Sequence, residues 1–240
     1  MKNELYLSTA YLDDLMVRMA HHSTAIEGNT LTQGETKSVL IDGYVPRAID
    51  LRELNEVLNY KAFTKQMVQF LLDGREVNSD FIKKIHAILC NEAIESVPGK
   101  FKTQPNMVIG ADFTPSPPYR VPMDIEQWRQ DLDYQLKNAA DARTMVEAIC
   151  RQHFRFERIH PFPDGNGRVG RALMVYSALQ QKLPPIVIPV DEKKKYINFL
   201  NTEDLNGFVE FCLALQQKEV ERIKILADER DKVLEIYTEE

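Results

Sequence analysis

Twelve consecutive residues, His160 to Arg171, constrain this chain more than any other segment. They place a histidine, an aspartate, three glycines and two arginines within one loop and the start of a helix. Gly165 and Gly167 let backbone N–H groups approach an oxyanion closely. The apolar run after Arg171 predicts a helix, whose positive N-terminal end would face the same point. Arg168 and Arg171 are three residues apart and therefore share a helical face. The segment is predicted to bind phosphate groups.

The same segment also reads as G-x-G-x-x-G, the glycine pattern of dinucleotide-binding folds, with Asp191 about twenty residues further on. That fold requires a buried strand immediately before the first glycine. Here Pro161 and Pro163 precede the glycines, and the apolar residues before them recur at helical spacing from Met145 to Ile159. A helix, a loop and a second helix are predicted instead.

Between His160 and Arg171 the sequence resembles the Fic family, whose pattern His-Pro-Phe-x-Asp/Glu-Gly-Asn-Gly-Arg-x-x-Arg is matched at every specified position. Fic proteins are mostly enzymes that transfer AMP from ATP to a hydroxyl side chain of a target protein. The resemblance implies that His160 is the general base, that Asp164 holds Mg²⁺ or Mn²⁺, and that ATP is the co-substrate. An imidazole suits this role, because it can accept a hydroxyl proton near neutral pH. The implied nucleotide-binding stretch comprises Asp164, Gly165, Asn166, Gly167, Arg168, Val169, Gly170 and Arg171, with the first glycines at the α-phosphate and the arginines at the outer phosphates.

An N-terminal segment, Leu5 to Ile26, carries apolar residues at helical spacing and is predicted to form an amphipathic helix that ends at Gly28. From spacing alone, Glu27 is a solvent-exposed glutamate at the negative end of this helix. However, Ser23-x-x-x-Glu27-Gly28 is similar to the inhibitory pattern Ser/Thr-x-x-x-Glu-Gly/Asn of self-restrained Fic proteins. This resemblance implies an inhibitory turn in which Glu27 pairs with Arg171 and removes the partner of the γ-phosphate.

Residues 98–122 are rich in proline and surround one β-like run, Met107-Val108-Ile109, followed by Gly110. Repeated prolines exclude a central strand and leave two interpretations, an irregular hairpin with an open edge or a connecting loop. Fic proteins have a β-hairpin flap in this position, which covers the nucleotide and pairs with the target segment. The resemblance therefore implies a flap at about 98–122, with Ile109 and Gly110 close to the nucleotide.

Asp191 is expected to begin a helix that carries Tyr196. A tyrosine on an amphipathic helix is usually a core residue. In Fic proteins, however, this helix lines the adenine pocket with an aromatic residue and, further along, an asparagine. The resemblance implies that Tyr196 and Ile197 contact the base, whereas the asparagine position stays open between Asn201 and Asp204.

The other titratable residues near the motif are most simply structural. His153 lies two helical turns before His160, but no third ligand is spaced to complete a metal site, which favours a buried histidine. His86 is predicted to be a packed or surface side chain for the same reason. Glu157 is expected to form an ion pair with a neighbouring arginine.

Composition predicts one domain over residues 1–240, because 240 residues with 44% hydrophobic content can bury a single sizeable core. We expect an all-α, Fic-type helical bundle with one small β-hairpin flap. Residues 1–30 would hold the inhibitory helix, and one helix would run from Leu205 to Tyr237, within a C-terminal region of residues 205–240. The widely spaced cysteines suit core thiols in a reducing cytoplasm; they are Cys90, Cys150 and Cys212.

The formal net charge of −6 argues against a nucleic-acid partner, because affinity for nucleic acids comes mostly from Lys and Arg. The sequence contains no run of eighteen apolar residues, so no membrane span is predicted. The favoured function is a protein adenylyltransferase that modifies a hydroxyl side chain of a target protein, or of itself, and that Glu27 restrains. Three alternatives stay open: removal of AMP using Glu27 and a metal-bound water, transfer of UMP or phosphocholine, and a non-enzymatic nucleotide-sensing module. The sequence also leaves a homo-oligomer open.

Overall fold

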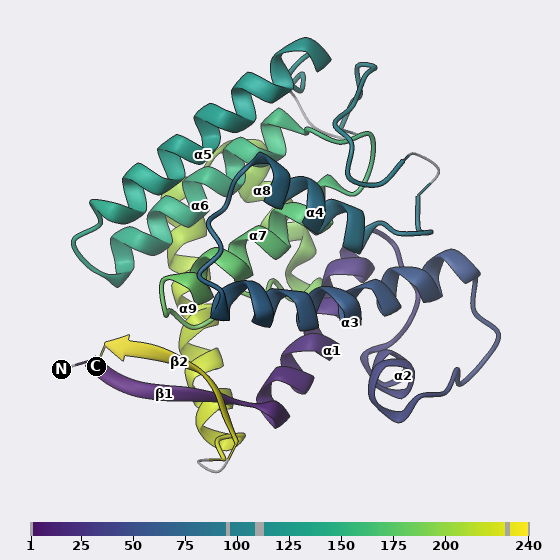
Figure 1. Ribbon diagram of the computed structural model, residues 1–240, viewed down its shortest axis with the longest axis vertical. Coiled ribbons are helices and arrows are strands. Elements are labelled where there is room, and N and C mark those ends of the chain that lie inside the picture. The colour runs from purple at the N-terminus through teal and green to yellow at the C-terminus, as the bar shows by residue number, and fades with distance from the viewer. Residues whose placement is uncertain (1, 95–96, 109–112, 229–230, 240) are drawn as a thin grey trace.

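The computed structural model describes residues 2–94, 97–108, 113–228 and 231–239. Helix α7 (Asn166–Gln180) runs through the centre of a helical bundle (Figure 1). Every residue from Arg168 to Leu179 is buried, and a helix buried on all sides belongs in the interior of a domain. The apolar run after the motif therefore forms the core helix, with the motif loop at its N-terminal end. The mostly helical fold with one small sheet confirms the predicted fold class.

Helix α6 (Ala142–Ile159) leads into the motif loop and covers one side of α7. It begins at a capping box, in which the Asp141 carboxylate accepts the Thr144 N–H and the Thr144 hydroxyl oxygen accepts the Asp141 N–H. Its other neighbours are α5 (Val121–Lys137) and α9 (Leu205–Ile225). This packing fixes the end of α6, where the motif histidine is located.

Two further helices cover the opposite side of α7, namely α1 (Thr9–Ile26) and α4 (Ser79–Leu89). Both also pack against α3 (Leu51–Leu72). The remaining short elements are α2 (Gln33–Lys37), the π-helical turn η1 (Ser38–Asp42), the 3₁₀ turns η2 (Pro118–Arg120) and η3 (Val190–Glu192), and α8 (Lys193–Thr202). The C-terminal end of α1 therefore comes close to the N-terminal half of α7.

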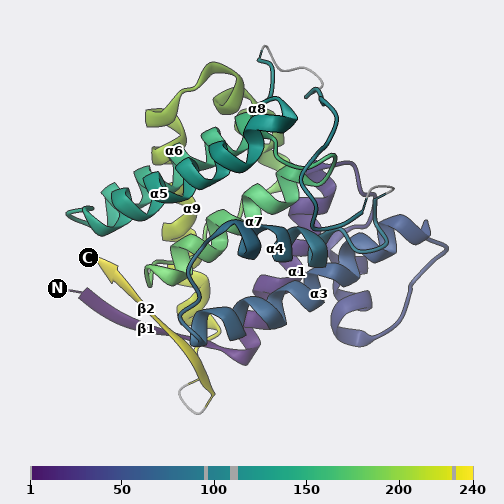
Figure 2. The ribbon, with the colours of Figure 1, turned by 45° about the horizontal axis from the view of Figure 1, so that its top comes forward.

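The two ends of the chain form the only sheet among the described residues. Strand β1 (Lys2–Ser8) pairs antiparallel with β2 (Lys232–Glu239), and both extend from the bundle in Figures 1 and 2. Leu7 and Ile236 are fully buried and anchor the strands to the bundle.

This sheet corrects two predicted helices. The N-terminal helix begins at Thr9, not at Leu5, because Ser8 accepts a hydrogen bond from the Tyr11 N–H and caps it. The C-terminal helix ends at Ile225 and does not continue to Tyr237. Each strand is short, and its partner lies more than two hundred residues away, so local spacing gave no signal for the pairing.

The predicted flap is only partly described. Residues 97–108 and 113–117 contain no strand, and a flap over the nucleotide at about 98–122 stays a prediction. Ile109 and Gly110 lie outside the described residues. The prolines that exclude a regular strand also favour this irregular path. The segment nevertheless follows the motif loop, because the Lys102 N–H donates to the Pro161 carbonyl at 2.9 Å.

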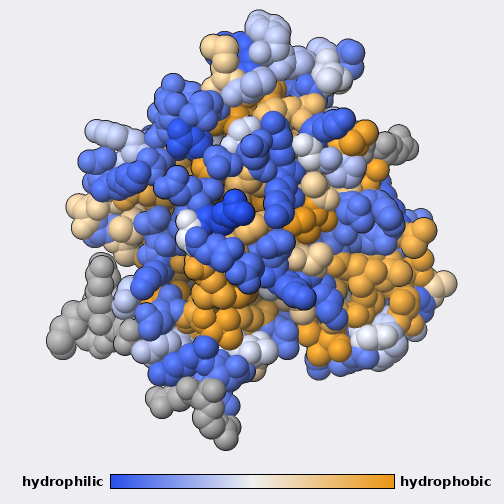
Figure 3. Space-filling model, in the orientation of Figure 1, coloured by the Kyte–Doolittle hydropathy of each residue, from blue (hydrophilic) through white to orange (hydrophobic). Residues whose placement is uncertain are grey.

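The surface in the view of Figure 3 mixes hydrophilic and apolar areas, and one of the apolar areas lies over α2, η1 and the start of α3. Its exposed large apolar side chains are Ile41, Tyr44, Val45 and Leu51. Within the described ranges, none of the helices is long and apolar enough to cross a bilayer.

Candidate functional site

The motif loop ends at Gly165, which has a positive φ of 77° and precedes the first residue of α7. Among the described residues, no side chain caps this helix end, so its first N–H groups are available to an anion. The Asn166 side chain instead holds the loop in shape. Its Oδ1 accepts the Phe162 N–H and its Nδ2 donates to the Phe162 carbonyl, both at 2.8 Å. Asn166 therefore retains only its backbone N–H for the α-phosphate that the sequence assigned to it.

His86, a buried histidine of α4, supports the motif loop. The Gly99 N–H donates to His86 Nδ1 at 2.7 Å, so Nε2 carries the proton and donates to the Asp164 carbonyl at 3.0 Å. The ring stacks on Phe162 at a centroid distance of 3.8 Å. Burial lowers the pKa of His86 to about 4, which keeps the imidazole neutral. His86 is thus a packed residue, and it also fixes the loop.

Lys102 and Asn106 hold the other side of the loop. The Lys102 ammonium is buried and donates to Asn106 Oδ1 at 2.6 Å and to the Ile159 carbonyl at 3.3 Å. Asn106 Nδ2 in turn donates to the Phe162 carbonyl at 2.8 Å. Burial lowers the pKa of Lys102 to about 8. Sequence reasoning missed both residues, since neither belongs to a recognisable pattern.

His160 ends α6 in the left-handed conformation, with φ 49° and ψ 60°. Its Nδ1 lies 3.2 Å from the Glu157 carbonyl. A carbonyl oxygen only accepts, so Nδ1 carries the proton and Nε2 carries the lone pair of the neutral ring. Burial lowers the pKa of His160 to about 4, and the Lys102 charge acts in the same direction. The structure therefore holds His160 in the form that can accept a proton.

The guanidinium of Arg171 is buried, and its Nε and one terminal nitrogen are held by the end of α1. Its Nε donates to Ser23 Oγ at 2.9 Å, and one terminal nitrogen donates to the Ser23 carbonyl at 2.9 Å and to Glu27 Oε1 at 2.5 Å. The structure thus brings together the residues that the resemblance paired. Gly28 follows with a φ of 106°, a backbone conformation that favours glycine and turns the chain away.

Glu27 lies directly against the N-terminal turn of α7. A side-chain carbon added at Gly167 would overlap Glu27 Oε1, so the carboxylate could keep this position only beside a glycine and would otherwise have to shift. About a third of the Glu27 side chain is exposed. Burial alone would raise the pKa of Glu27, but the Arg171 charge and hydrogen bond outweigh it and lower the pKa below its usual value. The carboxylate is therefore ionised where a phosphate would be expected.

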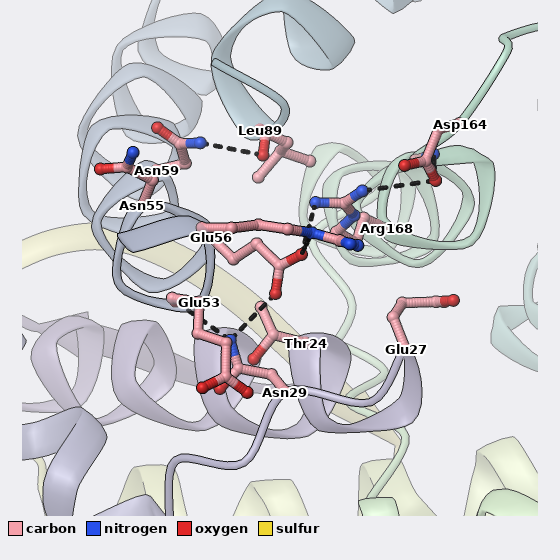
Figure 4. A network of polar contacts seen from close by, with 12 residues as sticks. Thr24, Glu27, Asn29, Glu53, Asn55, Glu56, Asn59, Leu89, Asp164 and Arg168 are labelled. Atoms are coloured by element: carbon pink, nitrogen blue, oxygen red, sulfur yellow. Dashed lines mark hydrogen bonds and ion pairs between the residues drawn. The ribbon is translucent and has the colours of Figure 1, made fainter. Parts of the chain in front are cut away.

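Arg168 is equally buried but has only long contacts. One terminal nitrogen lies 3.4 Å from Glu56 Oε1, and the other lies 3.6 Å from Asp164 Oδ1 (Figure 4). Its Nε has no hydrogen-bond partner among the described residues. A buried guanidinium normally satisfies its donors. Arg168 therefore keeps spare donor capacity for an anion.

The remaining motif residues face the core. Val169 is fully buried, and Gly170 lies against Glu157, because an added side-chain carbon would overlap the Glu157 carboxylate. Tyr196 is only 1% exposed, and its hydroxyl lies 2.8 Å from His153 Nε2. The structure thus places Tyr196 beneath the site and away from any open surface for a base. His153 is buried, as the sequence favoured.

Glu157 differs from its expected role. It is buried and does not pair with the neighbouring arginines, because Arg155 pairs with Asp131 and Arg158 pairs with Glu203. Burial raises the pKa of Glu157 to about 7, although the Arg171 charge opposes this shift. Its Oε1 has no partner in the described part of the chain.

The structure separates the two candidates for a base-binding polar residue. Asp204 accepts the Gly207 N–H at 2.9 Å and caps α9. Asn201 is exposed on α8, as is part of Ile197. The choice between Asn201 and Asp204 as the base contact stays a prediction.

Comparison with known proteins agrees with this geometry. Residues 76–178 match the model of the Fic/DOC family. The chain carries a Fic/DOC family domain. The matched part includes α4, the 97–108 segment, α6 and nearly all of α7.

Curated relatives of this Fic domain include protein adenylyltransferases. The chain is 30% identical over 207 residues to protein adenylyltransferase fic-1 of Caenorhabditis briggsae, and this alignment covers 84% of this chain and 40% of the relative. It is 28% identical over 221 residues to protein adenylyltransferase Fic of Drosophila virilis, which covers 90% of this chain and 41% of the relative. The chain thus spans about two fifths of the length of these relatives.

Solved Fic structures share the fold. A Fic domain containing signaling protein from Bacteroides thetaiotaomicron superposes with a TM-score of 0.81 at 25% identity, covering 95% of this chain and 90% of that one. Fic-1 from Caenorhabditis elegans superposes with a TM-score of 0.74 at 26% identity, covering 92% of this chain and 66% of that one. Both likenesses extend well beyond the twelve-residue motif.

The residues of the Fic motif fit a divalent cation only together with phosphates. Asp164 offers a half-exposed carboxylate, one oxygen of which accepts the Gly165 N–H at 2.6 Å. Within the described ranges, no cluster of three His, Cys, Asp or Glu side chains could hold a metal ion. Mg²⁺ is commonly bound by one or two carboxylates, with phosphate oxygens and waters as its other ligands. Asp164 suits that arrangement.

Proposed function

We propose that the chain is a protein adenylyltransferase, which transfers AMP from ATP to a Tyr, Thr or Ser hydroxyl of a target protein, and that Glu27 restrains it. The observation that carries this proposal is the engagement of Arg171 by Glu27 against Gly167, at the open N-terminal end of α7. A helix end with two buried arginines suits a polyphosphate, and an internal carboxylate already takes one of them. The names of the curated relatives support the same activity.

His160 would act as the general base of this transfer. Its Nε2 accepts the hydroxyl proton while the hydroxyl oxygen forms a bond to the α-phosphorus of ATP. The bond between the α-phosphorus and the bridging oxygen breaks, and pyrophosphate leaves. Since Glu157 holds Nδ1 through its carbonyl, the ring keeps the orientation and tautomer that this step requires.

The negative charge that develops on the phosphate oxygens would be stabilised by fixed donors. The backbone N–H groups at Gly167 and neighbouring positions face the α-phosphate, and Arg168 supplies donors to the outer phosphates. Mg²⁺, held by Asp164 and by phosphate oxygens, would supply further neutralisation. The loop contacts from His86 and Lys102 keep these donors in place before the nucleotide arrives.

Glu27 restrains the reaction by occupying Arg171. While this ion pair persists, the γ-phosphate lacks a cationic partner and meets a carboxylate instead. A Glu27→Gly variant should increase labelling of protein from α-labelled ATP by about a hundredfold, the typical value of one donor that stabilises developing charge. Glu27→Gly combined with His160→Ala is the control and should give no labelling. Equal, feeble labelling with and without Glu27 would contradict the proposal.

Removal of AMP from a modified protein is a second candidate, because the ionised Glu27 carboxylate is partly exposed and within electrostatic reach of His160. It could orient an attacking water there. In that case Glu27→Gly abolishes release of AMP from a modified target, whereas restraint of adenylylation predicts a gain of labelling. Measuring the intact mass after incubation with ATP, UTP and CDP-choline also tests transfer of UMP or phosphocholine.

We further propose that the protein works in the cytoplasm. Its three cysteines are free and buried, which suits a reducing compartment. Purification of the protein from cells with a thiol-blocking reagent, followed by mass measurement, would show the redox state of these cysteines.

A further inference from the structure

A buried glutamate outside the motif holds Arg168. Glu56 lies on α3 and is 3% exposed. Its Oε1 lies 3.4 Å from Arg168 and accepts from Arg52 Nε at 3.2 Å, and its Oε2 accepts from Asn29 Nδ2 at 2.9 Å (Figure 4). Both carboxylate oxygens thus face donors, and one of these donors belongs to a motif arginine.

The length of the contact between Glu56 and Arg168 matters. A separation of 3.4 Å exceeds the usual 2.7–3.2 Å of an N–H···O hydrogen bond. Glu56 therefore compensates the buried charge of Arg168 and fixes its direction without using up its donors. Arg171, in contrast, uses its Nε and one terminal nitrogen in three short hydrogen bonds to Ser23 and Glu27.

Glu56 also contacts the turn that carries Glu27. Asn29 follows Glu27 by two residues, and its Nδ2 donates to both the Glu56 carboxylate and the Glu53 carbonyl. Its Oδ1 accepts the Leu31 N–H at 3.0 Å, which fixes the amide orientation. A displacement of this turn would therefore change the donors available to Glu56.

We propose that Glu56 is a positioning residue, whose carboxylate orients Arg168 toward the outer phosphates of the nucleotide and links that orientation to the Glu27 turn through Asn29. The identity of the ligand rests on the proposed function. Glu56 itself does not touch the nucleotide in this proposal, since it acts only through Arg168.

The test compares two glutamates of the same helix in the Glu27→Gly background. Glu56→Gln removes the charge that orients Arg168. Glu53→Gln is the matched control, because Glu53 accepts from the Thr30 N–H and hydroxyl of the same loop, at 2.7 and 3.0 Å. Calorimetry with Mg²⁺ then measures the affinity for a non-hydrolysable ATP analogue and, separately, for AMP.

We expect Glu56→Gln to weaken binding of the ATP analogue by about tenfold to a hundredfold, the usual value of hydrogen bonds to charged groups. AMP binding should change less than about twofold, because AMP lacks the outer phosphates that Arg168 contacts. Glu53→Gln should change neither. Equal losses for both ligands would indicate a general structural effect and overturn the proposal, as would unchanged affinity for the ATP analogue.

The Asn29 link has its own test. Asn29→Ala should weaken binding of the ATP analogue to the Glu27→Gly protein. It should weaken binding little further once Glu56→Gln is present, because both substitutions act through one contact. Fully additive losses would contradict the link. The transfer reaction is measured separately: absence of labelling in the Glu27→Gly parent would defeat the proposed function, while the binding comparison would still decide the role of Glu56.

Discussion

The surroundings of Arg171 and Arg168 differ, although the two arginines lie one helical turn apart and are both buried. Arg171 makes short hydrogen bonds to Ser23 and Glu27, whereas Arg168 has contacts of 3.4 and 3.6 Å and an unpartnered Nε in the described structure. The difference teaches that the proposed restraint acts on one arginine only. The other remains available for a phosphate.

The largest expected effect comes from exchanging each arginine for alanine in two backgrounds. In the Glu27→Gly protein, Arg168→Ala and Arg171→Ala should each lower transfer by about a hundredfold. With Glu27 present, Arg168→Ala should lower transfer by a similar factor. Arg171→Ala should lower transfer by less than about tenfold in that background, because Arg171 is already paired with Glu27. Single-turnover labelling from ATP measures these rates.

If Arg171→Ala lowered transfer by the same factor in both backgrounds, the proposed difference between the two arginines would be wrong. Arg171 would then contribute to the reaction even while it is paired with Glu27. Arg75→Ala is a useful control, since Arg75 contacts Tyr176 and Gln180 only through its carbonyl oxygen, far along α7 from the motif.

An intermediate effect should come from Glu157, a carboxyl group within electrostatic reach of Arg171, Tyr196 and Glu27. Burial raises its pKa to about 7 in the folded protein, above the usual value of about 4.3. Between these values the folded state binds more protons than the unfolded state, so stability falls as pH rises. Relative to Glu157→Gln, the wild type should lose about 2 kcal/mol of unfolding free energy from pH 4.5 to 7.5.

Urea unfolding at several pH values measures this difference, and the other titrations cancel because both proteins share them. A pH-independent difference between the two proteins would show that Glu157 ionises in the folded state as it does in the unfolded chain. Arg171 would then have a second ionised carboxylate as a partner, and its contrast with Arg168 would be greater.

The smallest effect is expected for Ser23→Ala. This change removes the hydroxyl that accepts from Arg171 Nε but leaves the carbonyl bond and Glu27 in place. Stability should fall by about 1 kcal/mol, and labelling should rise only a few-fold because the ion pair persists. Thermal unfolding and labelling measure the two quantities. Thr24→Val is the control, since the Thr24 hydroxyl donates to Ala20 within its own helix. A rise as large as that of Glu27→Gly would assign the restraint to Ser23.

The central helix and the motif loop were predictable because their signals are local. The glycines, the apolar run after Arg171 and the helical spacing before His160 all lie within about thirty residues, and each has a direct physical meaning. The inhibitory turn needed the family resemblance, since spacing alone favoured an exposed Glu27. The structure brings Glu27 to Arg171 across more than a hundred residues of chain.

The residues that sequence reasoning missed have no local signal. Lys102, Asn106 and Glu56 lie on other segments and reach the motif only through the fold, and so does His86, whose burial was predicted but whose contact with the motif loop was not. The strands β1 and β2 were not predicted for the same reason, because their pairing joins the two ends of the chain. Tyr196 is buried, as simple helical spacing favoured, while the base contact that the family resemblance implies for it stays a prediction.

The left-handed backbone of His160 carries a cost in folding. Glycine or asparagine is the usual residue where a helix closes in this way, and a β-carbon there costs about 1 kcal/mol. An effort to make the protein more heat-resistant by optimising helix ends would select this position first. We expect such a change to yield a more stable but inactive protein, because the strained residue is the proposed general base.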